Sequence, residues 1–178
     1  MDGFIAREDG DIKWLVRFEN EEVHESYQGF IRTIDAVAIG RGTFEKVLTY
    51  PSWPYEHRVF VLSTSIKQLP KSVEGKADLL SMRPRAVLSH LSEKGISRVY
   101  VDGGKVIQDF LREDCIDEMI ITKVPVVLGN GIPLFGSLDA TIPFRHVRTT
   151  VFSNGLVKSH YERERTRDQR SRGRQAAQ

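Results

Sequence analysis

The chain has 178 residues, 40% of them hydrophobic and 28% charged, which is typical of one soluble globular domain. No apolar run approaches the roughly 20 residues that cross a bilayer, and the first residues lack the basic-then-apolar order of a signal peptide. We therefore expect a cytoplasmic protein. The single cysteine, Cys115, excludes an internal disulfide and a cysteine-cluster metal site, so we expect an inert core thiol and no metal.

Positive charge is concentrated at the end of the chain. Residues 162–178 hold six arginines and three acids, so this tail carries +3 and residues 1–161 carry −1 of the total of +2. The tail lacks apolar periodicity, which predicts a disordered, solvated segment. Since no aromatic residues interleave with its arginines, we do not expect nucleic-acid binding. The sequence thus predicts one domain over residues 1–161 and a basic tail over 162–178.

Runs rich in valine and isoleucine alternate with stretches of helical apolar spacing. In chain order the pattern predicts a helix over 21–34, strands over 35–40 and 58–63, a helix over 85–94, a strand over 98–103, a helix over 105–113 and a strand over 118–129. Two alternating runs, 144–152 and 156–161, surround a Ser-Asn-Gly turn typical of a hairpin. The sequence therefore predicts an α/β fold, with a central, mostly parallel sheet flanked by helices and a C-terminal antiparallel hairpin.

Three predicted strands end in residues suited to phosphate. The strand at 35–40 leads into IGRGTFE (39–45), the strand at 58–63 ends in LSTS (62–65), and the strand at 98–103 runs into the DGGK of residues 102–105. Because ligands of open α/β sheets bind outside the carboxyl ends of the strands, the three endings could line one crevice. Each ending also has a purely structural interpretation, as a turn, a helix cap or a tight corner.

The order of these motifs along the chain resembles that of a known fold. The segments MDGFIA (1–6), DAVAIGRGTFE (35–45), VFVLSTS (59–65), VYVDGGKVIQDFL (99–111) and ITKVPVVLGNGIPLFG (121–136) resemble the dihydrofolate reductase fold. Within that fold the chain is most similar to the C-terminal reductase domain of riboflavin biosynthesis, the RibD C-terminal family. The resemblance implies an NADPH-dependent reductase that acts on a small-molecule substrate and forms a homodimer.

The resemblance implies a set of cofactor-binding positions. Gly40, Arg41 and Thr43 would lie at the pyrophosphate and adenosine side, with Arg41 next to the 2′-phosphate that distinguishes NADPH from NADH. Ser63 and Thr64 would lie at the ribose phosphate, and Ile5 and Ala6 along the nicotinamide. The turn over the pyrophosphate would consist of Gly103, Gly104, Lys105 and Val106.

The substrate side is implied less closely. The dihydrofolate reductase fold carries a substrate-binding carboxylate on its first helix, and the resemblance puts the corresponding position of this chain near His24 and Glu25. Thr122 resembles a threonine that supports that carboxylate. These three are the candidate catalytic residues, and Trp14, Trp53 and Leu134 are the candidate substrate-binding residues. The substrate implied for the riboflavin branch is 5-amino-6-(5-phosphoribosylamino)uracil.

Two alternatives stay open at this stage. One is a catalytically inactive nucleotide-binding module of the same fold, and the other is an RNA-associated protein acting through the arginine-rich tail. Relatives of this fold normally carry a further β-strand before the turn at residues 2–3, so we also expect that a start codon upstream of Met1 would supply it.

Overall fold

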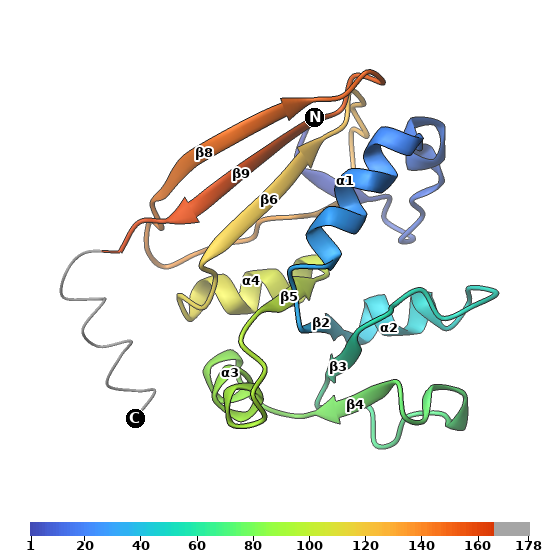
Figure 1. Cartoon of the computed structure of the whole chain (residues 1–178), viewed down its shortest axis with the longest axis vertical. Helices are drawn as coiled ribbons and strands as arrows, with labels where there is room; N and C mark the ends of the chain where they lie inside the picture. The colour runs from blue at the N-terminus through green and yellow to red at the C-terminus, as the bar shows by residue number, and fades with distance from the viewer. Residues whose placement is uncertain (166–178) are drawn as a thin grey trace.

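The computed structural model describes residues 1–165, and the part of the predicted disordered tail (162–178) from residue 166 onward lies outside the described residues. The described chain forms short helices and strands that alternate over most of its length (Figure 1). In chain order they are β1 (Phe4–Ala6), the 3₁₀ helix η1 (Lys13–Phe18), α1 (Glu21–Ile31), β2 (Ala36–Gly40), α2 (Arg41–Val47), β3 (Arg58–Leu62), the 3₁₀ helix η2 (Lys71–Val73), β4 (Ala77–Leu80), α3 (Pro84–Glu93), β5 (Val99–Asp102), α4 (Gly104–Arg112), β6 (Glu118–Lys123), β7 (Ile132–Pro133), β8 (Phe144–Val151) and β9 (Val157–Arg163).

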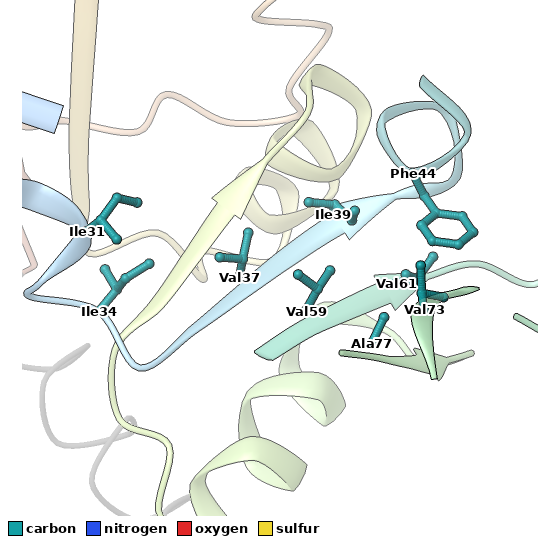
Figure 2. Packing of buried hydrophobic residues seen from close by; sticks show 9 residues of the cluster. All are labelled: Ile31, Ile34, Val37, Ile39, Phe44, Val59, Val61, Val73 and Ala77. Carbon is teal, nitrogen blue, oxygen red and sulfur yellow. The ribbon is translucent and has the colours of Figure 1, made fainter. Parts of the chain in front are cut away.

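The main sheet has four parallel strands in the order β4-β3-β2-β5. Strand β2 lies inside it and buries four of its five residues, because a strand covered by helices on both faces needs apolar side chains on both. One face packs Val37, Ile39 and Val59 against Phe44 of α2 (Figure 2). The other face packs Ala36 and Phe60 against α3 and α4. This layered sheet confirms the α/β prediction.

A second sheet is antiparallel, in the order β6-β9-β8. Strands β8 and β9 form the predicted hairpin around residues 153–155, where Gly155 has a φ of +85°. A small cluster of Phe18, Val124, Phe152 and Leu156 fills the end of this sheet nearest η1. The short pair β1-β7 forms a third sheet of two strands.

The two larger sheets do not join. Strand β5 is the last strand of the parallel sheet and β6 the first of the antiparallel one, and α4 connects them without a hydrogen-bonded ladder between them. Figure 1 shows β6, β9 and β8 side by side, with β5 and β2 beyond a gap that α1 and α4 flank.

Several boundaries differ from the sequence prediction. The helix expected over 21–34 ends at Ile31, and the strand expected over 118–129 ends at Lys123, ahead of Pro125. Strand β4 was not predicted, because ADLL is short and carries an aspartate. Strand β9 extends to Arg163, so part of the predicted tail belongs to the sheet.

The arginine at the end of β9 is a structural residue. Its side chain is only 5% exposed, and its Nε donates to Asp114 Oδ1 at 2.7 Å while a terminal nitrogen donates to the carbonyl of Pro143. Arg165 pairs with Asp117 in the same region. No helix among residues 1–165 is both long and apolar enough to cross a membrane.

Candidate functional site: two glycine turns beside a cavity

The carboxyl ends of β2, β3 and β5 lie at one edge of the parallel sheet. Gly40 stands opposite Leu62, and Ile39 stands opposite Asp102. The residues that follow these strands therefore emerge side by side. This register brings the three strand endings noted in the sequence to one edge.

The turns after β2 and β5 touch each other. Gly103 has a φ of +97°, and a β-carbon built on it would lie 2.5 Å from Thr43 Oγ1. A β-carbon on Gly40 would lie 2.7 Å from Val106 Cγ2. Glycine is needed at both positions, because a side chain at either would push the two turns apart.

Both helices that start at these turns begin without a side-chain cap. The N-cap residues are Gly40 for α2 and Gly103 for α4, and neither can offer a side-chain acceptor to the first backbone N–H groups. Arg41 is exposed at the start of α2 and pairs with Glu45 at 3.5 Å, and Lys105 is exposed on the first turn of α4. Unpaired N–H groups near two cationic side chains can bind an anion such as a phosphate.

The serine-rich ending of β3 has a structural function of its own. Ser63 Oγ accepts hydrogen bonds from the backbone N–H groups of Ser65 at 3.2 Å and Ile66 at 3.1 Å. This arrangement closes a local turn, as serine commonly does. Thr64 is exposed beside it.

Strand β1 and its partner β7 pack against the glycine turn that follows β5. A β-carbon on Gly104 would lie 2.9 Å from the carbonyl oxygen of Pro133 in β7 and 3.0 Å from Ile5 Cδ1 in β1. Ala6 is buried next in the strand. The structure thus brings Ile5 and Ala6 together with the glycine turns, as expected for residues of one crevice.

A cavity of about 560 Å³ opens beside this edge, between β5 and β6 and under α1. Its lining is mostly apolar but includes several polar side chains. Six of the lining residues matter for the candidate site: the apolar Ile5 and Leu134, and the polar Tyr27, Asp102, Thr122 and Lys158. Thr122 and Leu134, both predicted site residues, therefore share the cavity with Ile5.

Asp102 is one of three acidic residues that line this cavity, with Asp117 and Glu118, and it is the one next to the glycine turn after β5. It lies at the end of β5 and accepts a hydrogen bond from the N–H of Gly103 at 2.9 Å. Burial raises its pKa above the usual value, and the hydrogen bonds from Gly103 and from the Tyr100 hydroxyl offset only part of that rise. Burial, followed by the nearby Asp102 charge, also raises the pKa of Tyr27 and Tyr100. A carboxyl group with a raised pKa in a cavity can hold a proton for transfer.

Lys158 is one of two cationic residues that line the cavity, and the other, Arg98, pairs with Glu118. Lys158 stands opposite Thr122 in the β6-β9 ladder and donates to Ser26 Oγ on α1. Burial, and secondarily the charge of Arg148, lowers its pKa. Within residues 1–165 no carboxylate lies within ion-pair distance of its ammonium group, so the cation is free to attract a polar or anionic ligand group.

Two of the predicted catalytic residues are not in the cavity. His24 and Glu25 are exposed, whereas the cavity is lined by Val23, Ser26, Tyr27 and Phe30 of the same helix. Successive helical residues point about 100° apart, so His24 and Glu25 lie on a different face of α1 from the residues that line the cavity.

The two tryptophans also lie elsewhere. Trp53 packs edge-on against Phe44 and Tyr55, with ring centroids 6.5 Å and 5.5 Å away. Trp14 packs against the cluster around Phe18. Neither lines the cavity, so the structure supports packing rather than substrate contact for both residues.

Sequence reasoning missed three cavity residues. Asp102 was treated only as part of a turn, although an acid between a buried strand and two glycines is itself a signal. Tyr27 lies one helical turn from the apolar Val23 and Phe30, and this spacing marks the inward face of α1. Lys158 sits among ordinary alternating strand residues, and nothing local to it signals a site.

The parallel α/β sheet with adjoining glycine turns at its carboxyl edge, followed by an antiparallel hairpin, is the arrangement of a dihydrofolate reductase-like fold. Residues 1–158 match the RibD C-terminal domain, and the chain belongs to that family.

Relatives of known sequence or structure agree with this membership. The "Uncharacterized protein YwjB" of Bacillus subtilis is 40% identical over 167 residues, which cover 92% of each chain. A "Putative riboflavin biosynthesis protein" from Shewanella sp. PV-4 is 36% identical, superposes with a TM-score of 0.88, and covers 93% of this chain and 94% of its own.

A more distant structure shares the fold alone. It is a diaminohydroxyphosphoribosylaminopyrimidine deaminase/5-amino-6-(5-phosphoribosylamino)uracil reductase from Thermotoga maritima, with 22% identity and a TM-score of 0.68. The match covers 91% of this chain and 53% of the Thermotoga chain.

Proposed function

We propose that this protein is an NADPH-dependent reductase that transfers hydride to a small heterocyclic or carbonyl-bearing substrate. The observation that carries the proposal is the contact between the glycine turns of β2 and β5, at two uncapped helix starts beside a cavity that contains a half-buried acid. Family membership supports a reductase.

The residues at the sheet edge fit a dinucleotide. The uncapped first turns of α2 and α4 leave backbone N–H groups that a pyrophosphate could accept from, beside Gly40, Thr43 and Gly103, and Gly104 lets the turn approach β1. Arg41 would meet a 2′-phosphate, in competition with its ion pair to Glu45. The other residues assigned to the cofactor are Ser63, Thr64, Lys105, Val106, Ile5 and Ala6. NADPH bound there would supply the hydride.

The cavity would hold the substrate. Ile5, Leu134 and the apolar lining exclude water around the reacting atoms. Reduction adds a hydride to carbon and a proton to the neighbouring oxygen or nitrogen. Because its pKa is raised, Asp102 keeps a proton at a higher pH than an exposed aspartate and would donate it to that atom. Thr122 and Lys158 would orient polar groups of the substrate.

The substrate class follows from the same cavity. Lys158 lines the cavity without a carboxylate within ion-pair distance among residues 1–165, which suits a substrate with an anionic group. A pyrimidine such as 5-amino-6-(5-phosphoribosylamino)uracil, which the Thermotoga relative is named as reducing, carries such a group. We therefore propose that substrate class, and a cytoplasmic homodimer as the working form.

Thermal unfolding with NADPH and with NADH tests the cofactor assignment. A ligand at 100 times its dissociation constant stabilises a protein by about 2.7 kcal/mol, a change that a melting curve detects. We expect NADPH to stabilise the protein more than NADH. Arg41→Ala should remove that preference, whereas the matched control Arg145→Ala, an exposed arginine on β8, should keep it.

Two outcomes would count against the proposal. If neither nucleotide shifts the melting temperature of the folded protein, there is no dinucleotide site. If NADPH binds but is not oxidised in the presence of the phosphoribosyl-pyrimidine or a pterin, the alternative of an inactive nucleotide-binding module gains support.

A further inference from the structure

The segment of residues 129–136, which contains β7, is fastened to α4 by one side chain. The amide nitrogen of Gln108 donates to the carbonyl of Pro133 and to the carbonyl of Leu134, each at 3.3 Å. A primary amide has two N–H donors, so one group can serve both carbonyls. The reverse orientation of the amide would place Oε1 against two carbonyl oxygens, and the donors therefore face the segment.

Two glycines make room for this contact. A β-carbon on Gly136 would lie 2.5 Å from Gln108 Oε1 and 2.9 Å from Gln108 Cδ, and a β-carbon on Gly104 would lie 2.9 Å from the carbonyl oxygen of Pro133. A side chain at either position would displace its neighbour, because these distances are shorter than ordinary contacts of a β-carbon. The amide therefore fits between the first turn of α4 and the segment that it holds.

This Gln108 clamp, the amide with its two carbonyl acceptors, joins the two halves of the proposed site. On one side, Gln108 and Gly104 share a face of α4, because residues four apart in a helix lie one above the other. Gly104 belongs to the turn proposed for the cofactor pyrophosphate. On the other side, Leu134 and Phe135 line the candidate substrate cavity. A single side chain thus connects the cofactor turn to one wall of the cavity.

The held segment is otherwise weakly anchored. β7 has two residues and pairs with the three-residue β1 in an irregular register. A two-stranded pair of this length is marginal on its own. Phe135 is 46% exposed and Ile132 is 38% exposed, so burial fixes these side chains only in part. The position of the segment therefore depends on the clamp as well as on the strand pairing.

We propose that Gln108 is a positioning residue that couples cofactor binding to the shape of the substrate cavity, an inference that rests on the proposed function. The coupling needs two arrangements: a closed clamp, with the segment bound to α4, and an open clamp, with the segment released. A pyrophosphate that accepts from the first N–H groups of α4 orders the start of this helix and favours the closed arrangement. The substrate contacts Leu134 in the closed arrangement, so each ligand favours binding of the other.

Backbone hydrogen exchange with NADP⁺, the oxidised cofactor, tests the coupling without turnover. Gln108→Glu keeps the size of the side chain but replaces both N–H donors by a carboxylate. Gly136→Ala leaves Gln108 in the chain and puts a methyl group where its amide lies, at a position without a positive φ. Asp109→Asn is the matched control, because Asp109 is the next residue of α4 and pairs with Arg112 of the same helix.

In the unchanged protein and in Asp109→Asn, NADP⁺ should slow exchange about threefold or more in both 103–106 and 132–136. In Gln108→Glu and Gly136→Ala, NADP⁺ should still slow exchange in 103–106 but should leave that in 132–136 within about 1.5-fold. The same two variants should reduce the mutual tightening of NADP⁺ and 5-amino-6-(5-phosphoribosylamino)uracil from about fivefold or more to less than about twofold.

The exchange pattern separates the two ways of failing. Protection of 103–106 without protection of 132–136 in the unchanged protein would overturn this inference and leave the cofactor site intact. Protection of 132–136 that persists in either variant would also overturn it, because Gln108 would then not carry the coupling. If NADP⁺ protects neither segment of the folded, unchanged protein, the proposed function is refuted and the inference with it.

Discussion

The contact between Gly103 and Thr43 can be measured as an energetic coupling. Gly103→Ala places a methyl group where the backbone has φ +97° and ψ 127°, a region that residues other than glycine rarely adopt. That conformation costs about 1–3 kcal/mol. The new β-carbon would also lie 2.5 Å from Thr43 Oγ1, and relieving an overpacked contact of this kind costs about 1–3 kcal/mol. We expect the substitution to lower the free energy of unfolding by the sum of the two costs, about 2–6 kcal/mol.

The second substitution separates the two costs. Thr43→Ala removes Oγ1, and the next nearest atom, Thr43 Cβ, lies at 3.7 Å, an ordinary contact distance. Gly103→Ala should therefore cost about 1–3 kcal/mol less in the Thr43→Ala background. The contact cost is then gone, and only the cost of the backbone conformation remains. Urea unfolding of the two single variants and the double variant gives these values by linear extrapolation.

A matched glycine serves as control. Gly42 lies in α2 without a positive φ, and a β-carbon built on it would meet no atom within 4 Å. Gly42→Ala should therefore stabilise the protein by up to about 1 kcal/mol. If Gly103→Ala costs the same in both backgrounds, the two turns do not touch and the shared cofactor edge is refuted.

Two further predictions concern charged groups away from this contact. Because the pKa of Asp102 is raised in the folded state, the folded protein holds this proton more tightly than the unfolded chain, and stability is lost as pH rises above about 4. The stability of Asp102→Asn relative to the unchanged protein should therefore increase between about pH 4.5 and about pH 7.5 in urea titrations, and a constant difference would contradict the burial of the acid. Arg163→Ala should lower the free energy of unfolding by about 2–3 kcal/mol, because it leaves Asp114 unpaired in a largely buried site. Arg145→Ala, at an exposed pair with Glu162, should change it by less than about 1 kcal/mol, and equal effects would contradict a structural assignment for the end of β9.

The sequence predicted strands most successfully where both faces of the strand are buried. The strands at 35–40, 58–63 and 98–103 were found because near-continuous apolar runs allow few other interpretations, and the structure confirms them as β2, β3 and β5. The hairpin was found from its Ser-Asn-Gly turn. Strand β4 was not predicted, because ADLL carries no such apolar run. Its pairing with β3 depends on contacts between residues distant in sequence.

The site was harder to predict than the fold. The glycine turns could be located because a strand end followed by glycine has a local physical reason. The face of α1 could not be inferred from spacing alone, since an error of one residue moves a side chain by about 100°, and this is why His24 and Glu25 were chosen in place of Ser26 and Tyr27. Lys158 reaches the cavity only through the β6-β9 register, which no single segment encodes.

The separation of the two large sheets has a consequence for how the molecule opens. The parallel sheet is held by its own two hydrophobic clusters, and the antiparallel sheet ends in a third. Units with separate cores can part at a lower free energy than either needs to melt. We therefore expect fluctuations of the native state to concentrate at the boundary between β5 and β6, where the candidate substrate cavity lies. Access to the cavity can arise from a relative movement of two intact halves, without loss of secondary structure in either.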